Sequence, residues 1–176
     1  MKNPNVTILG ATGAVGREML KILEERSFPI GELRCLASAR SVGKNLSFAG
    51  REIMVEEATD AAFTDADIVL GAAENDIARR FAPAIKATGA VFIDNSSAFR
   101  MDEDVPLVVP EINPEDALHH HGIIANPNCS TIITLVFGFI LTKIGYANIW
   151  PLFGSANQLL SALVLGSPVS CTHLTL

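Results

Sequence analysis

The sequence predicts an α/β fold with a Rossmann-like, doubly wound and mostly parallel sheet. The first observation is a series of short apolar runs of strand length, at residues 6–9, 33–37, 67–70, 90–93 and 122–125. The second is helical spacing of apolar residues in two of the intervening segments, 17–26 and 76–86. The third is a glycine-rich turn between the first run and the first helical segment, which is the context that a dinucleotide-binding fingerprint requires.

The glycine-rich turn is Gly10-Ala11-Thr12-Gly13-Ala14-Val15-Gly16. Glycines allow backbone to approach a pyrophosphate, and the N-terminus of the following helix offers N–H donors and positive potential. The spacing is G-x-x-G-x-x-G rather than G-x-G-x-x-G, so a glycine turn without a ligand is the alternative interpretation. The flanking strand and helix favour a dinucleotide site.

The second strand, 33–37, ends at Ser38-Ala39-Arg40-Ser41. In NAD-binding domains an acidic side chain near this point usually binds the ribose 2′-hydroxyl. Here a guanidinium lies between two hydroxyls and no carboxylate is present, a set that suits a 2′-phosphate. The pattern therefore favours NADP over NAD, and a solvated arginine in a polar turn is the alternative. Cys35 alternates into the strand, which predicts a core position.

The following segments complete the predicted sheet. Residues 46–48 and 53–55 suggest a small hairpin. Gly71 to Asn75 follows a buried strand and is in position to line the cofactor crevice at the strand's carboxyl end. Residues 114–117 suggest a short helix before the last strand.

Asp94-Asn95-Ser96-Ser97-Ala98-Phe99-Arg100-Met101-Asp102 begins at the carboxyl end of a strand, where ligands bind in open α/β sheets. Arg100 is a candidate for binding an anionic substrate group, a phosphate or a carboxylate. A surface salt bridge is an equally good interpretation, because Asp102, Glu103 and Asp104 are close in sequence.

Cys129 lies in Asn126-Pro127-Asn128-Cys129-Ser130-Thr131, between a predicted strand and a second apolar run that suggests a helix. Free backbone N–H groups and the positive end of a helix dipole favour a thiolate at such a position. A thiolate there can attack an electrophilic carbonyl and form a thioester. A small buried cysteine with a packing role is the alternative, and spacing alone leaves both open.

Composition restricts the class of protein. The chain has 176 residues, of which 49% are hydrophobic and 18% charged, with a net charge of −6. The acidic balance argues against nucleic acid and membrane as partners. Three cysteines at unpatterned spacing indicate no disulfide framework and no metal site, and the consecutive histidines at 119–121 suit a solvated turn. The N-terminus lacks the apolar stretch of a signal peptide, so we expect a cytoplasmic protein.

Five stretches together give the chain a specific resemblance. They are GATGAVG at 10–16, SARS at 38–41, DNSSAFRMD at 94–102, VPLVVPEIN at 105–113 and NPNCST at 126–131. In this order they resemble the bacterial, NADP-dependent aspartate-semialdehyde dehydrogenases. The resemblance covers roughly residues 5–135. GATGAVG is widely shared, whereas DNSSAFRMD and NPNCST together are close to diagnostic.

The resemblance implies a role for each matched residue. The pyrophosphate of NADP would lie on Gly10, Thr12, Gly13, Ala14, Val15 and Gly16, and the 2′-phosphate on Ser38, Arg40 and Ser41. Arg100 would bind the substrate phosphate or the inorganic phosphate that replaces it. Cys129 would be the nucleophile, with Asn128 beside it to orient the substrate.

The implied reaction is the NADPH-dependent reductive dephosphorylation of 4-phospho-L-aspartate to aspartate 4-semialdehyde, through a thioacyl intermediate on Cys129. The resemblance therefore implies a phosphorylating aldehyde dehydrogenase, which is an oxidoreductase. This step would serve lysine, threonine and methionine biosynthesis, with diaminopimelate on the lysine branch. The resemblance also implies a homodimer or larger assembly.

The sequence departs from the family pattern after the nucleophile. We expect residues 1–135 to form the NADP-binding domain and 136–176 to be an atypical apolar tail, from a truncated or frameshifted reading. The family's second domain, with the catalytic base and most of the dimer surface, is not recognisable in this chain. We therefore expect the chain as given to be inactive. The 71–75 stretch also lacks the glycine-serine pair of many members.

Three other functions are compatible with parts of the pattern. N-acetyl-γ-glutamyl-phosphate reductase performs the same chemistry on a longer substrate, but NPNCST and DNSSAFR argue against it. Glyceraldehyde-3-phosphate dehydrogenase is a weaker alternative, because its nucleotide specificity would favour an acidic residue at 38–41. A non-catalytic NADP-binding module is the third, and the cysteine at 129 argues against it.

Overall fold

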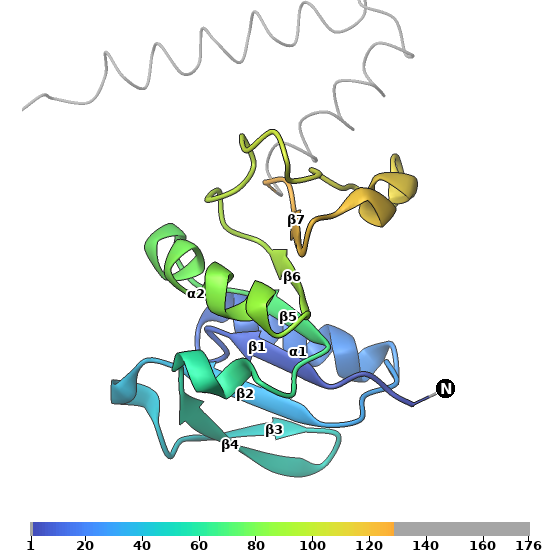
Figure 1. Ribbon diagram of the computed structural model, residues 1–176. Helices are drawn as coiled ribbons and strands as arrows, with labels where there is room; N and C mark the ends of the chain where they lie inside the picture. The colour runs from blue at the N-terminus through green and yellow to red at the C-terminus, as the bar shows by residue number, and fades with distance from the viewer. Residues whose placement is uncertain (1, 129–176) are drawn as a thin grey trace, which may run out of the picture. The chain divides into compact units, whose positions relative to one another are not determined.

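The computed structural model describes residues 2–128 of the chain, which belong to one compact unit ending at Asn128 (Figure 1). Its strands are β1 (Val6–Leu9), β2 (Leu33–Ala37), β3 (Asn45–Phe48), β4 (Arg51–Glu57), β5 (Ile68–Gly71), β6 (Val91–Asp94) and β7 (Ile123–Ala125). Its α-helices are α1 (Ala14–Glu25) and α2 (Asn75–Ala87). Three short 3-10 helices complete this part, η1 (Ala39–Ser41), η2 (Asp60–Phe63) and η3 (Pro114–His119).

The strands form one seven-stranded sheet in the order β3-β4-β2-β1-β5-β6-β7. All neighbouring pairs are parallel except β3 with β4, which form an antiparallel hairpin at one edge. From β4 to β7 this is the strand order of a dinucleotide-binding fold, and the direction of winding reverses at β1. The sequence prediction of a doubly wound, mostly parallel sheet is therefore confirmed.

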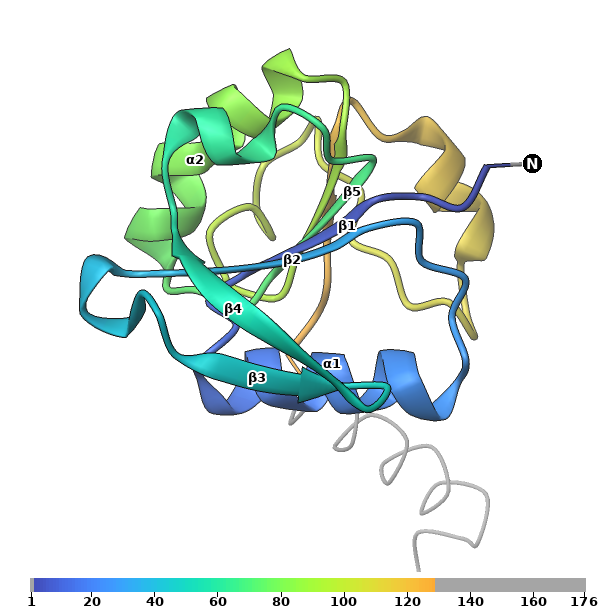
Figure 2. The ribbon, with the colours of Figure 1, turned by 90° about the horizontal axis from the view of Figure 1, so that it is seen from below.

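The two α-helices cover opposite faces of the sheet, as Figure 2 shows. On the α1 face, Leu20 packs with Ile8 and Cys35 from the two central strands. On the α2 face, the next residues along these strands, Leu9 and Leu36, are buried instead. Successive strand residues point to opposite faces of the sheet, and helices cover both faces. Residues on both faces of the central strands are therefore buried, which explains the continuous apolar runs in the sequence.

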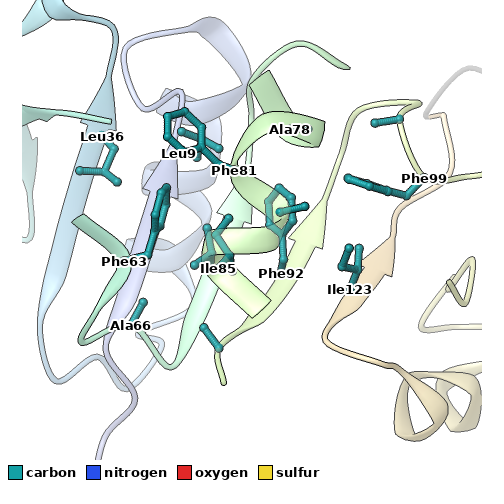
Figure 3. Packing of buried hydrophobic residues seen from close by; sticks show 14 of the residues in the cluster. Leu9, Leu36, Phe63, Ala66, Ala78, Phe81, Ile85, Phe92, Phe99 and Ile123 are labelled. Carbon is teal, nitrogen blue, oxygen red and sulfur yellow. The ribbon is translucent and has the colours of Figure 1, made fainter. Parts of the chain in front are cut away.

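The larger core lies between α2 and the sheet (Figure 3). Helix α2 buries Ala78, Phe81, Ala82 and Ile85, whose spacing of three and four places them on one face. The ring centroids of Phe63 and Phe81 are 5.4 Å apart, and those of Phe92 and Phe99 are 6.2 Å apart with an edge-on arrangement. These aromatic pairs tie η2 and the segment after β6 to the same core.

Most of the predicted elements are present, with two differences in detail. Helix α1 begins at Ala14 rather than at residue 17, because Gly13 is already the N-cap. The predicted short helix at 114–117 is a 3-10 helix that runs to His119. Cys35 is completely buried, as predicted. The expectations for Cys129 and for the tail at 136–176 lie outside the described residues.

Among residues 2–128, no helix has the length and apolar character needed to cross a membrane. The same part of the chain contains no group of three or more histidine, cysteine or acidic side chains that could bind a metal ion.

Candidate cofactor groove and active-site edge

A groove of about 650 Å³ lies at the carboxyl ends of four strands, β1, β2, β4 and β5. This is the edge of the sheet, and the point of strand reversal, where open α/β folds bind ligands. Its lining comprises Leu9, Gly10, Thr12, Gly13, Ala37, Ser38, Ala39, Arg40, Glu57, Ala58, Ala72, Ala73, Glu74, Ile77, Arg80 and Phe81. The groove brings the glycine turn and the end of β2 together.

Two glycines of the turn are required by close backbone packing. Gly10 has a φ of +91°, and a Cβ there would lie 2.8 Å from the carbonyl carbon and oxygen of Ala72. A Cβ on Gly16 would lie 2.4 Å from the Gly10 carbonyl oxygen and 2.7 Å from Ala11 Cα. The turn therefore packs directly against the β5 end and against the first turn of α1, which fixes its shape.

Gly13 is different, because it leaves the start of α1 open. It is the N-cap of the helix, and a Cβ there would meet only the Gly10 carbonyl oxygen within 4 Å, at 3.4 Å. No side chain in the described part of the chain caps α1, and its first turn carries no acidic residue. The first N–H groups of a helix have no intrahelical acceptor, so this end offers donors and positive potential to an anion. The arrangement fits a pyrophosphate.

Ser38 and Arg40 line the groove from the end of β2 and from η1. Both side chains are exposed, so they are available to a ligand. Two acidic residues line the same groove, Glu57 at the end of β4 and Glu74 after β5. Sequence reasoning did not single out Glu57, because it placed the nucleotide-selecting residues on the second strand alone.

Helix α2 forms one wall of the groove, which the sequence analysis did not predict. Ile77, Arg80 and Phe81 line it, and the guanidinium carbon of Arg80 lies 4.6 Å from the centroid of the Phe81 ring. The spacing of α2 would have indicated an exposed arginine next to the buried Phe81, but only the fold shows that this face meets the groove. A flat stacked guanidinium beside apolar side chains is a suitable wall for a planar base.

Four predicted cofactor residues do not line the groove. Ala14, Val15 and Gly16 belong to the first turn of α1, where they could contribute backbone N–H groups rather than side chains. Ser41 ends η1 and is half-buried, next to the lining residue Arg40.

Arg100 lies at the carboxyl edge of the sheet, beside the ends of β6 and β7. Its Nε donates to the Asn126 carbonyl oxygen at 2.9 Å, and one terminal nitrogen donates to the Asn95 carbonyl oxygen at 2.9 Å. Among the described residues it forms no ion pair with its acidic sequence neighbours, and Asp102 instead pairs with Arg79 at 3.6 Å. The salt-bridge interpretation is therefore not what the structure shows. Two of the five guanidinium N–H groups bind carbonyls, and the other three have no hydrogen-bond acceptor among residues 2–128.

Asn95 and Asn126 connect the two strand ends directly. The side-chain amide of Asn126 donates to the Asn95 side-chain oxygen at 2.7 Å, and the Asn126 backbone N–H donates to the Asp94 carbonyl oxygen at 2.8 Å. The backbone N–H of Asn95 donates to the Gly71 carbonyl oxygen at 3.1 Å. These bonds fix the path of the chain as it leaves β7, two residues before the exposed Asn128. Cys129 follows and lies outside the described residues.

Helix α2 is joined to the same edge through Asn75. Its side chain accepts a hydrogen bond from the Ser97 backbone N–H at 3.0 Å and donates one to the Ser97 hydroxyl at 2.9 Å. A second hollow, of about 460 Å³, lies against Ala73, Glu74, Asn75, Asp76 and Ser96. Ala73 and Glu74 line both hollows, so the groove continues toward the strand ends that carry Arg100.

Asp94 is the unusual residue of this edge. Its side chain is completely buried, Oδ2 accepts a hydrogen bond from the Ser96 hydroxyl at 2.5 Å, and Oδ1 has no partner among the described residues. Burial raises the pKa of this carboxyl, against the opposing effects of the Ser96 hydrogen bonds and the Arg100 charge. The sequence placed Asp94 at a strand end but gave no indication of an unpaired buried carboxyl.

The strand order, the glycine turn and the groove above it define a dinucleotide-binding domain of the Rossmann type. The chain belongs to the semialdehyde dehydrogenase family, because its residues 5–120 match the model described as semialdehyde dehydrogenase, NAD binding domain.

Named relatives agree with this assignment. The aspartate-semialdehyde dehydrogenase of Synechocystis sp. is 56% identical over 128 residues, which are 73% of this chain and 38% of the relative. That of Shewanella violacea is 42% identical over 167 residues, 90% of this chain and 49% of the relative. A crystal structure of aspartate semialdehyde dehydrogenase II from Vibrio cholerae, complexed with ASA, superposes with a TM-score of 0.73 at 48% identity, over 76% of this chain and 44% of that one.

The chain therefore spans between about a third and a half of the length of these curated relatives. The match to the Shewanella protein reaches 90% of the chain, so part of it lies beyond the described residues. The relatives carry the name aspartate-semialdehyde dehydrogenase and do not favour the three alternative functions.

Proposed function

We propose that this chain supplies the NADP-binding domain and the nucleophile of an aspartate-semialdehyde dehydrogenase. The observation that carries the proposal is the adjacency of two sites on one sheet edge. The cofactor groove ends at Ala73 and Glu74, after β5. Arg100 and its partners Asn95 and Asn126 follow at the ends of the neighbouring strands β6 and β7. An enzyme that transfers a hydride to an acyl group taken from an acyl phosphate needs a dinucleotide site next to a site for the phosphoryl group.

NADP is the cofactor that the groove suits best. We assign the pyrophosphate to the backbone of Gly10 and of residues 12–16, and the 2′-phosphate to Ser38, Arg40 and Ser41. Two hydroxyls and a guanidinium supply donors to a dianion. The end of β2, where a carboxylate would bind a ribose 2′-hydroxyl, carries none, and Glu57 lines the groove from the end of β4 instead. The adenine would lie against Arg80 and its apolar neighbours on α2. When bound, the reduced cofactor supplies the hydride of the reaction.

Arg100 would bind the phosphoryl group of 4-phospho-L-aspartate. Its contacts with the Asn95 and Asn126 carbonyls hold the guanidinium in place before the substrate arrives, and the remaining N–H groups can bind two phosphate oxygens. Preorganised donors of this kind also stabilise charge that develops on the leaving group.

Cys129 would act as the nucleophile, with Asn128 orienting the substrate. In the proposed first half-reaction the thiolate sulfur forms a bond to the acyl carbon, the carbon–oxygen bond to phosphate breaks, and inorganic phosphate leaves with both bonding electrons. The product is an aspartyl thioester on Cys129. The proposal places the protein in the cytoplasm, where a thiol such as Cys35 stays reduced.

The test is to trap this first half-reaction on the chain. The protein is mixed with 4-phospho-L-aspartate, phosphate release is measured, and the thioester is located by mass spectrometry of the peptide that contains Cys129. Turnover is not expected of the chain as given, because the catalytic base is not recognisable in it, but a thiolate at Cys129 can perform the acylation step alone. We therefore expect release of no more than one phosphate per chain, and an adduct that Cys129→Ser abolishes and the control Cys171→Ser does not. Absence of the adduct, or equal acylation by N-acetyl-γ-glutamyl phosphate, would contradict the proposal.

A further inference from the structure

Asp94 occupies a position that costs stability. Its side chain is fully buried at the carboxyl end of β6, and Oδ1 has no hydrogen-bond partner among residues 2–128. The space for this oxygen exists only because residue 71 is glycine, since a Cβ there would lie 2.7 Å from Oδ1. Buried unpaired carboxyls are expensive, and they concentrate at functional sites.

The carboxyl also determines the shape of the turn that carries Arg100. Asp94 Oδ2 accepts from the Ser96 hydroxyl at 2.5 Å, and the Ser96 oxygen in turn accepts the Ala98 backbone N–H at 3.1 Å. The turn is further anchored where a terminal nitrogen of Arg79 donates to the Ala98 carbonyl oxygen. Asp94 therefore lies at the base of the turn, and Arg100 lies at its end.

Arg100 is the basic residue of this turn, and Asn126 bonds to both Asp94 and Arg100. The Asn126 backbone N–H donates to the Asp94 carbonyl oxygen at 2.8 Å, and the Asn126 carbonyl oxygen accepts from Arg100 Nε at 2.9 Å. The neighbouring strands β5 and β7 contain no ionisable residue, and Phe99 is apolar. Helix α2 presents Asp76, Arg79, Arg80 and Lys86, with Glu74 at its N-cap. The positive charge of the Arg100 guanidinium favours the ionised form of the Asp94 carboxyl, against the larger effect of burial.

We propose that Asp94 is a positioning residue for Arg100 whose buried carboxyl sets the oxyanion affinity of that guanidinium through its own protonation. The inference deepens the proposed function, because it rests on Arg100 as the site of the substrate phosphoryl group. While Asp94 is ionised, it offsets the Arg100 charge and weakens anion binding. When Asp94 takes up a proton from solvent, the full guanidinium charge is available to the anion.

Linkage makes the effect reciprocal. An anion on Arg100 neutralises the charge that favours the carboxylate, so anion binding draws a proton onto Asp94, and anion release returns that proton to solvent. In the proposed reaction, phosphate departure would thus reset the carboxyl to its ionised form. We expect an effect of about tenfold in affinity, which lies within the usual range for coupling between two sites.

The experiment titrates the whole chain with sulfate, which stays a dianion from pH 4.5 to 8, at constant ionic strength set with chloride. Binding is followed through the Arg100 Nε–H resonance in ¹H–¹⁵N spectra, and the ¹³C shift of the Asp94 carboxyl reports its protonation. The variants are Asp94→Asn, which keeps an acceptor for Ser96, and Arg100→Ala. Asp102→Asn is the matched control, because it removes the same charge from a residue that pairs with Arg79.

We expect the wild type and Asp102→Asn to bind sulfate about tenfold more tightly at low pH than at pH 8, and Asp94→Asn to bind tightly at every pH. Saturating sulfate should raise the midpoint of the Asp94 titration. The same pH dependence in Asp94→Asn, or an Asp94 midpoint that sulfate does not move, overturns the inference and leaves the anion role of Arg100 intact. Sulfate affinity unchanged by Arg100→Ala overturns both.

Discussion

The substitution Gly16→Ala tests the packing around the glycine turn, because helix propensity and steric overlap change the stability in opposite directions. The residue has ordinary helical backbone inside α1, where alanine normally stabilises a helix by about 0.5–1 kcal/mol relative to glycine. Propensity alone therefore predicts that Gly16→Ala is more stable than the wild type.

The structure predicts the opposite sign. The new Cβ would lie 2.4 Å from the Gly10 carbonyl oxygen, 2.7 Å from Ala11 Cα and 2.9 Å from the Ala11 carbonyl carbon. These are backbone atoms of a turn that is itself packed against β5, so they have no rotamer through which to move away. Overpacking of this kind costs up to about 3 kcal/mol, and after subtraction of the helical gain a net loss of about 2 kcal/mol remains.

Urea unfolding followed by circular dichroism measures this difference. With a slope of about 2 kcal/mol per molar urea, the midpoint of Gly16→Ala should fall by about 1 M at unchanged slope. Gly13→Ala is the control, because the nearest atom to its Cβ is 3.4 Å away and the loss of a glycine N-cap costs less than about 1 kcal/mol. A midpoint for Gly16→Ala equal to or above the wild type would refute the packing of the turn described above.

Three further predictions concern the core and its titratable groups. Phe92→Ala should lower the free energy of unfolding by about 3–5 kcal/mol, because the ring is fully buried between α2 and Phe99, whereas Met101→Ala, at an exposed residue, should change it by less than about 0.5 kcal/mol. Burial, and to a smaller extent Glu56, raises the pKa of Cys35 to about 11, so iodoacetamide at pH 8 should modify Cys35 only after unfolding in urea, as peptide mass spectrometry would show. Asp94 has a raised pKa in the folded state, so its contribution to stability is present below about pH 3.9 and is lost as the pH rises through the folded pKa; Asp94→Asn should therefore unfold at higher urea than the wild type at pH 8, with a smaller difference at pH 4.5.

The fold was predictable because the spacing of apolar residues and the positions of the turn residues indicate the same elements along this chain. Apolar runs of strand length mark five of the six parallel strands, β1, β2, β5, β6 and β7, and the glycine turn marks the first crossover. What the sequence could not give is the exact start of α1, which depends on Gly13 acting as the N-cap without a side chain. Element boundaries depend on such local backbone geometry more than on hydrophobic pattern.

The candidate site was predictable where the motif residues lie at strand ends. Thr12, Ser38 and Arg40 meet in one groove because parallel strands bring their carboxyl ends to the same edge. Arg80 was not predictable, since its role depends on which face of α2 adjoins the groove. The two readings of Arg100 could be separated only by geometry, because sequence distance alone placed three carboxylates within its reach.

Asp94 shows most clearly what sequence reasoning lacks. An aspartate at a strand end is ordinarily solvated or paired, and nothing in DNSSAFRMD indicates that one carboxyl oxygen is buried with no partner among residues 2–128. The pairing of Asp94 with Gly71 across β5 and β6 arises from strand register, which joins residues 23 positions apart. Only the folded structure shows that these two residues lie opposite each other and that the carboxyl is buried there.

The measurement that tests the central claim most directly is the affinity of the chain for NADPH and for NADH, from nicotinamide fluorescence at one salt concentration. With Arg40 exposed and its charge partly screened, we predict NADPH to bind about tenfold more tightly than NADH, and Arg40→Ala to remove most of that preference. Equal binding of the two, tighter binding of NADH, or a preference that survives Arg40→Ala would contradict the assignment of this groove to NADP.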